Sequence, residues 1–144
     1  MRAFVGKLSM DKSSRPTYME SSVDASLTAA STFAEACYAL GDDLPEHRRL
    51  VEPVLTPRFV PTCSNKLLEG LGKLSQERKL RVQSHMAESH DQVAWVRAER
   101  GAEDMEVFER VSPDDAYQNS ILMIMEEWPA YFAHGASPLH LPGF

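Results

Sequence analysis

The order in which strand-like and helix-like patterns follow one another constrains the fold of this chain more than any other feature. Three short β-prone segments alternate with three helical patterns. In chain order these six segments span residues 3–10, 22–40, 53–59, 65–79, 80–84 and 91–100. Such alternation predicts an α/β fold with parallel strands joined by right-handed crossovers. Functional residues of such folds gather where the strands end, so we expect Asp11, Arg58, Phe59 and His85–Glu88 to share one edge of the sheet.

Serines and glycines mark the helix boundaries. Ser22 and Ser64 each precede a helical pattern and can accept hydrogen bonds from N–H groups of the first turn. Gly41 and Gly101 follow helical patterns and are typical of helix ends. Pro57 interrupts the second β-prone segment and predicts that the strand ends or bulges there.

The C-terminal part carries less regular patterns. Glu103–Arg110 predicts a helix, and Ser112–Asp115 has the cap, proline and acids of a helix start. We expect a helix over Tyr117–Trp128, stopped by Pro129, and an irregular segment over Tyr131–Phe144.

Composition excludes several classes of function. A chain of 144 residues is long enough for one domain with a core. The net charge of −6 argues against binding to nucleic acid. The apolar run Ser120–Met125 is far too short to span a membrane. The two cysteines, Cys37 and Cys63, are widely separated, form no thiolate zinc site and fit a reducing cytoplasm, so we expect a cytoplasmic protein.

A histidine followed three residues later by a carboxylate is the strongest chemical signal. His85 ends a predicted strand and Glu88 lies just beyond it. A histidine can hold a divalent metal, and a nearby carboxylate can move the protons of a metal-bound water. The alternative is a hydrogen-bonded core histidine at a strand end. A His-Glu-x-x-His pattern and the Pro-Cys-x-x-Cys signature of the zinc base deaminases are both absent.

Two further candidate sites each allow two interpretations. Arg58 and Phe59 form either an ordinary surface arginine beside a core aromatic, or a recognition pair for a flat base. In the second case the guanidinium donates to the base and the aromatic ring stacks on it. His134, between an alanine and a flexible glycine, is either a loop residue or a second metal ligand.

Three segments together resemble guanine deaminase, a zinc aminohydrolase of the amidohydrolase superfamily built on a (β/α)₈ barrel. They are Arg2–Lys7, then Leu55–Phe59 with Cys63-Ser64, then Val82–Glu88, and they occur in the order of that family. The similarity is good from residue 2 to about residue 96. The resemblance implies a partial barrel of three to four strand-helix units over residues 1–110 and a divergent segment over residues 111–144.

The resemblance also implies roles and partners. Glu88 would be the catalytic proton shuttle, Arg58 and Phe59 would bind guanine, and His85 would bind zinc beside the substrate. His134 would be a further metal ligand. The implied reaction is hydrolysis of guanine to xanthine and ammonia, and the implied assembly is a homodimer. Zinc lowers the pKa of its bound water to about 7, which makes hydroxide available at neutral pH.

Some of the family's metal ligands are missing from this sequence. It has no His-x-His pair and no Gly-Thr-Asp segment, whereas a catalytic zinc normally needs about three protein ligands. We therefore expect a fragment that is inactive by itself. The alternatives are another aminohydrolase of the superfamily, or a non-catalytic truncated paralogue that pairs with a full-length subunit.

Overall fold

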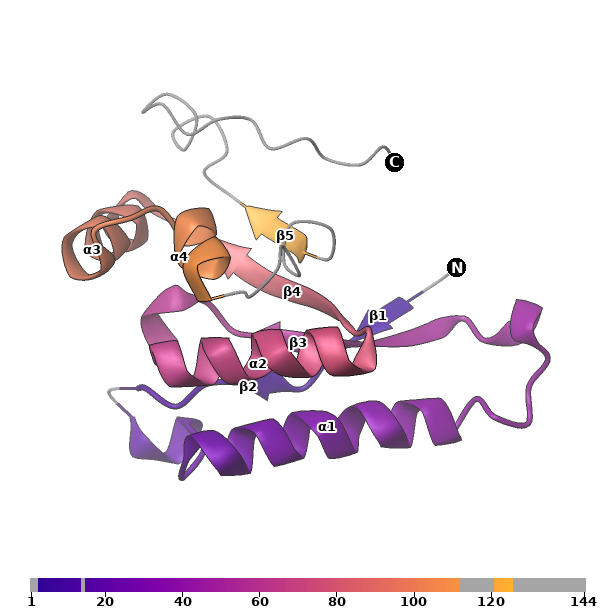
Figure 1. The fold of residues 1–144 in the computed structure, drawn as a ribbon. Coiled ribbons are helices and arrows are strands. Elements are labelled where there is room, and N and C mark those ends of the chain that lie inside the picture. Colours follow the sequence, from indigo (N-terminus) through magenta and orange to yellow (C-terminus); the bar gives the residue numbers. More distant parts are fainter. Residues whose placement is uncertain (1–2, 14, 112–120, 126–144) are drawn as a thin grey trace.

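A parallel β-sheet forms the centre of the molecule, in a computed structural model that describes residues 3–13, 15–111 and 121–125. Within these residues the sheet has the order β1-β3-β4-β5, and the short β2 also pairs with β3 (Figure 1). Every pairing in it is parallel, which confirms the α/β prediction. The strands are β1 (Ala3–Val5), β2 (Leu8–Ser9), β3 (Val51–Pro57), β4 (Arg81–Met86) and β5 (Ile121–Met125).

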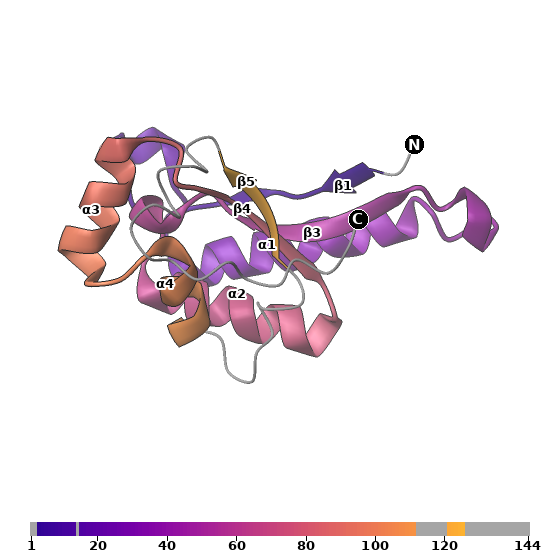
Figure 2. The ribbon, with the colours of Figure 1, turned by 90° about the horizontal axis from the view of Figure 1, so that it is seen from above.

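Helices connect the strands and begin at the predicted serines. α1 and α2 lie side by side on one face of the sheet, and α3 lies beyond the carboxyl end of β4 (Figures 1 and 2). Ser22 Oγ accepts the N–H of Ala25 at 3.0 Å, and Ser64 Oγ accepts that of Leu67 at 3.1 Å. The helices are α1 (Val23–Ala39), α2 (Asn65–Arg78), α3 (His90–Arg100) and α4 (Asp104–Val111), with 3₁₀ turns at Pro16–Tyr18, Glu46–Arg48 and Val60–Thr62.

The first predicted strand, over residues 3–10, is divided in two at Gly6. A Cβ built at Gly6 would lie 1.9 Å from Thr56 Oγ1 and 2.6 Å from the carbonyl oxygen of Val54. Only glycine fits at this distance from β3, and the chain between β1 and β2 leaves regular pairing there.

The helix predicted over Tyr117–Trp128 is wrong where the structure describes it. Ile121–Met125 is strand β5, paired with β4 from Val82 to Met86. A short continuous apolar run suits a buried parallel strand as well as a helix, so its periodicity could not decide between them. The expectations for residues 112–115 and 131–144 lie outside the described residues.

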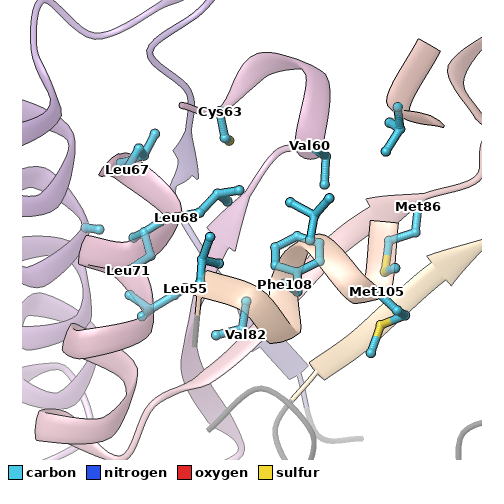
Figure 3. Packing of buried hydrophobic residues seen from close by; sticks show 14 of the residues in the cluster. Leu55, Val60, Cys63, Leu67, Leu68, Leu71, Val82, Met86, Met105 and Phe108 are labelled. Atoms are coloured by element: carbon cyan, nitrogen blue, oxygen red, sulfur yellow. The ribbon is translucent and has the colours of Figure 1, made fainter. Parts of the chain in front are cut away.

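The core lies between the sheet and the helices α1, α2 and α4. Figure 3 shows the ring of Phe108, from α4, among the side chains of Leu55, Val60 and Val82. All four side chains are essentially fully buried. Truncating a buried phenylalanine to alanine typically lowers the free energy of unfolding by about 3–5 kcal/mol. Packing of Phe108 therefore contributes strongly to holding α4 against the sheet. Within the described residues, no helix is long and apolar enough to cross a membrane.

Candidate active site

The structure brings the predicted recognition pair and the predicted metal ligand to one edge of the sheet. Arg58 follows the last residue of β3, and His85 is the penultimate residue of β4. The parallel register pairs Val54 with Arg81, and the same offset places Arg58 opposite His85. The carbonyl oxygen of Arg58 accepts the backbone N–H of His85 at 3.1 Å.

The imidazole of His85 is oriented by that same carbonyl. Its Nδ1 lies 3.3 Å from the carbonyl oxygen of Arg58. A carbonyl oxygen only accepts hydrogen bonds, so this contact assigns the ring proton to Nδ1 and leaves the lone pair on Nε2. Metal-binding histidines commonly have this arrangement, with the second ring N–H donated to a backbone carbonyl. The half-buried ring therefore fits a metal ligand through Nε2, although a hydrogen-bonded core histidine would make the same contact.

The guanidinium of Arg58 is exposed and borders a surface pocket of about 430 Å³. It lies 5.4 Å from the ring centroid of Phe59 and makes a 3.9 Å contact to the Met10 sulfur. Within the described part of the chain no ion pair involves Arg58, and a guanidinium offers several planar donors to a ligand. The other residues lining this pocket are Leu8, Met10, Thr17, Tyr18, Met19 and Glu20.

Glu88 stands in a tightly held turn directly after β4. Its backbone N–H donates to Gln92 Oε1 at 2.9 Å. The preceding residue, Ala87, has a φ of 48° and donates its N–H to Asp104 Oδ2 at 3.1 Å. The side chain of Glu88 is half-buried, and it follows His85 at the same edge of the sheet.

Asp104 and Gln92 are site-supporting residues that sequence patterns did not single out. Burial raises the pKa of Asp104 to about 6. The hydrogen bond from the N–H of Ala87 acts in the opposite direction and lowers this pKa. The negative charges of Glu103 and Glu88 raise the same pKa further. In the sequence, Asp104 only marks the acidic first turn of a helix, where any exposed acid would suit the helix dipole.

Asp11 and Cys63 do not contribute reactive groups here. The Oδ1 atom of Asp11 accepts the N–H of Ser64 at 2.7 Å, so this carboxylate supports the start of α2. Burial raises the pKa of Cys63 to about 12, with a smaller contribution from the charge of Asp11. A thiol with that pKa stays protonated near neutral pH and is not a nucleophile.

The described residues supply one fitting metal ligand. No group of three or more His, Cys, Asp or Glu side chains in this part of the chain is arranged to hold a metal ion. His134, the second predicted ligand, lies outside the described residues. A three-ligand catalytic zinc site would need groups in addition to His85.

Similar proteins share both the sequence and the fold of this region. The guanine deaminase of Dictyostelium discoideum is 37% identical over 97 residues, which are 67% of this chain and 20% of that protein. The probable guanine deaminase of Schizosaccharomyces pombe is 31% identical over 134 residues, 92% of this chain and 23% of that protein. The chain thus spans about a fifth of the length of these curated relatives. No established protein-family pattern matches it.

Solved structures give the same picture. Guanine deaminase from C. acetobutylicum, with guanine bound in its active site, superposes with a TM-score of 0.64 at 33% identity, over 85% of this chain and 27% of that one. An adenosine deaminase from Xanthomonas campestris with bound zinc superposes with a TM-score of 0.65 at 21% identity, over 85% and 25%, and shows the fold alone. The predicted resemblance is confirmed: this chain is similar to a segment of guanine deaminase.

Proposed function

We propose that this chain carries the guanine-recognition and proton-transfer elements of a zinc-dependent guanine deaminase, acting in the cytoplasm on guanine to give xanthine and ammonia. The observation that carries the proposal is the pairing of Arg58 with His85. Arg58 lines the surface pocket, and its backbone carbonyl oxygen contacts both the backbone N–H and the Nδ1 atom of His85, the histidine that can hold a metal. The match to the guanine-bound C. acetobutylicum structure supports this assignment.

The parallel sheet and its helices are, in this proposal, three to four consecutive units of a (β/α)₈ barrel. The superposition covers 85% of this chain but only 27% of the C. acetobutylicum chain, as expected for part of a larger closed barrel. Barrel enzymes place their chemistry at the carboxyl ends of the strands, where Arg58, His85 and Glu88 lie.

Arg58 and Phe59 are the proposed guanine contacts. A guanidinium presents planar N–H donors that match the carbonyl oxygen and ring nitrogen of a purine. The Phe59 side chain is partly accessible and its ring is large enough to stack on a flat base. The cation–π contact between the two side chains aligns the donors with the aromatic surface, with a separation of 5.4 Å.

His85 and Glu88 are the proposed chemical residues. When bound, zinc would supply a water whose pKa is near 7. The Nδ1–H of His85, held by the carbonyl of Arg58, directs Nε2 toward ligation. The carboxylate of Glu88 would take one proton from the attacking water and deliver it to the purine ring nitrogen, and it would then pass the proton of the newly added hydroxyl to the departing amino group. The carbon–nitrogen bond then breaks and ammonia leaves. His134 is proposed as a further ligand, and the rest of the metal shell comes from outside the described residues.

Measuring guanine binding by the chain tests the proposed role of Arg58 in recognising guanine. Isothermal titration should show guanine binding that Arg58→Ala weakens at least tenfold, the effect of losing about 1.4 kcal/mol of contact. Arg81→Ala is a matched control, because Arg81 also stacks on a phenylalanine, Phe4, at 5.3 Å, but at the opposite end of the strands. Equal weakening by both substitutions, or no binding by the unmodified chain, would refute the recognition role.

Exchange of residues 3–111 into the C. acetobutylicum enzyme, in place of the segment that they match, tests the chemical half. The hybrid should form xanthine from guanine, and Glu88→Gln in it should lower kcat by roughly 10²–10⁴-fold, the usual contribution of a positioned general acid or base. Glu77→Gln, at an exposed position of α2, should leave kcat unchanged. By itself the chain should form no xanthine, because its described residues hold too few metal ligands.

We propose pairing with another subunit as the alternative role. A chain with the recognition residues but one described metal ligand could pair with a complete deaminase subunit or a second copy of itself. Co-purification of the chain with a full-length guanine deaminase would support pairing, and a monomer that ignores the deaminase would exclude it.

A further inference from the structure

The turn at Ala87 has an unusual backbone for its position. Among the described residues, Lys79, Ala87 and Gly101 have positive φ. Lys79 and Gly101 cap the ends of α2 and α3, where the left-handed conformation is ordinary. Ala87 instead follows a strand, is fully buried and carries a Cβ that makes its φ of 48° unfavourable. Another interaction must hold it there.

Two buried side chains from different helices supply that interaction. Asp104 of α4, 1% exposed, accepts the N–H of Ala87 through Oδ2 at 3.1 Å. Gln92 of α3, 8% exposed, accepts the N–H of Glu88 through Oε1 at 2.9 Å. Two consecutive peptide groups are thus fixed from two directions, and the first of these contacts spans 17 residues of sequence.

This arrangement is costly for stability. The Oδ1 atom of Asp104 and the Nε2 atom of Gln92 are buried, and no described residue gives either of them a hydrogen-bond partner. A buried polar atom without a hydrogen-bond partner lowers the stability of the fold. Strained backbone and poorly satisfied polar groups occur together where function requires a fixed geometry, and here they surround one residue, Glu88.

We propose that Asp104 is a positioning residue for Glu88: by holding the N–H of Ala87 in the left-handed turn, it fixes the backbone from which the Glu88 carboxyl extends. The proposal rests on the proposed function, in which Glu88 transfers protons. Proton transfer needs the carboxyl within about 2.6–3.2 Å of its partner, and a displacement of about 1 Å can lower the rate a hundredfold. A rotation at residue 87 would move Glu88 by more than that, because Glu88 is the next residue.

Amide hydrogen exchange of the full chain, followed by NMR, tests the proposal. Asp104→Leu should speed exchange of the Ala87 and Glu88 amides at least tenfold and leave the slow amides of β4 and α2 unchanged. Asp104→Asn keeps an acceptor oxygen of the same shape and should restore most of the protection. Glu106→Gln, an exposed carboxylate of the same helix paired with Arg110, is the matched control and should change nothing at residues 87 and 88. If Asp104→Leu does not fold, the smaller Asp104→Ala takes its place.

Each outcome decides the proposal. Fast exchange confined to residues 87 and 88 and reversed by Asp104→Asn supports positioning. Unchanged exchange at these residues refutes it, as does an equal loss of protection across α4 and β4, which would mean that Asp104 only attaches the helix. The readout needs neither zinc nor guanine, so a failure of deaminase activity in the hybrid enzyme would refute the proposed function and leave this result standing.

Discussion

The loops after β3 and β4 sit side by side at the same edge of the sheet, yet they are built in opposite ways. After β3, the side chain of Arg58 is exposed; within the described part of the chain it lies over the Phe59 ring and contacts the Met10 sulfur. After β4, Ala87 is fully buried, and two buried polar side chains hold the turn. The loop after β3, here called the open loop, places Arg58 at a pocket. In the turn after β4, here called the closed turn, the N–H groups of Ala87 and Glu88 are bonded to buried side chains.

The difference matches the two tasks proposed for the loops. A planar guanidinium can meet a flat base over a range of small displacements, because its several donors share one plane. A proton shuttle has no such tolerance, since the rate depends steeply on the distance between heavy atoms. The left-handed backbone of Ala87 and the unpartnered atoms of Asp104 and Gln92 after β4 are consistent with the stricter geometry of the second proposed task.

The largest effect on stability should come from a larger side chain at Ala87, in the closed turn. Ala87→Val puts a β-branched side chain into a left-handed, fully buried position, and should lower the free energy of unfolding by roughly 2–4 kcal/mol from overpacking and backbone strain. Lys79→Val is the matched control, with φ 54° but an exposed side chain, and should cost only about 1 kcal/mol. Urea denaturation would measure both, and equal costs would show that the turn at Ala87 is not specially constrained.

The next effect concerns the buried carboxyl that holds the turn. Burial raises the pKa of Asp104 from 3.8 to about 6, so the folded protein keeps a proton that the unfolded chain has lost. The contribution of Asp104 to the free energy of unfolding should therefore fall by roughly 3 kcal/mol as the pH rises from about 4 to about 6, and stay level above that.

Chemical denaturation of the unmodified chain and of Asp104→Asn across this pH range isolates that contribution. The difference between the two stabilities should follow the predicted fall, because asparagine does not titrate. Glu106→Gln should keep the pH dependence of the unmodified chain. A constant difference between pH 4 and pH 7 would contradict the raised pKa.

The smallest effect on stability is expected at the open loop. Arg58→Lys should change the free energy of unfolding by less than about 0.5 kcal/mol, because the side chain is exposed. Guanine binding should nevertheless weaken about tenfold, since an ammonium keeps the charge but loses the planar donors. Arg81→Lys, at another arginine that lies over an aromatic ring, should leave binding unchanged. A large loss of stability in Arg58→Lys would remove the contrast between the two loops.

The sequence predicted the helix ends correctly where contacts between near neighbours in the chain determine them. Ser22 and Ser64 act as caps as expected, and Gly101 ends α3 in the left-handed conformation. The placement of Arg58 opposite His85 follows from strand order and parallel pairing, both of which the sequence order predicts.

Contacts between distant parts of the chain escaped prediction. Nothing near Asp104 in the sequence indicates that its carboxylate reaches Ala87, 17 residues away. The contact of Gln92 with the N–H of Glu88 is local, and the Ser89-x-x-Gln92 pattern of a capping box could have indicated it. Asp11 lies at the expected edge, two residues beyond the pairing of Ser9 with Pro57, but the contact of its carboxylate with the start of α2 was not predicted. Residues 121–125 became a strand because β4 offers them a parallel partner, which a short apolar run cannot reveal.

The support of His85 by the carbonyl of Arg58 bears on how such a site can evolve. The supporting atom belongs to the main chain, so it is present whichever side chain stands at position 58. Substitutions there can change which ligand is recognised without removing the hydrogen bond that orients the histidine. Proline is the exception, because the N–H of Arg58 donates to the carbonyl of Ser9 at 3.1 Å. In the proposed site, a substitution at position 58 would therefore change ligand recognition and keep the support of the metal-binding histidine.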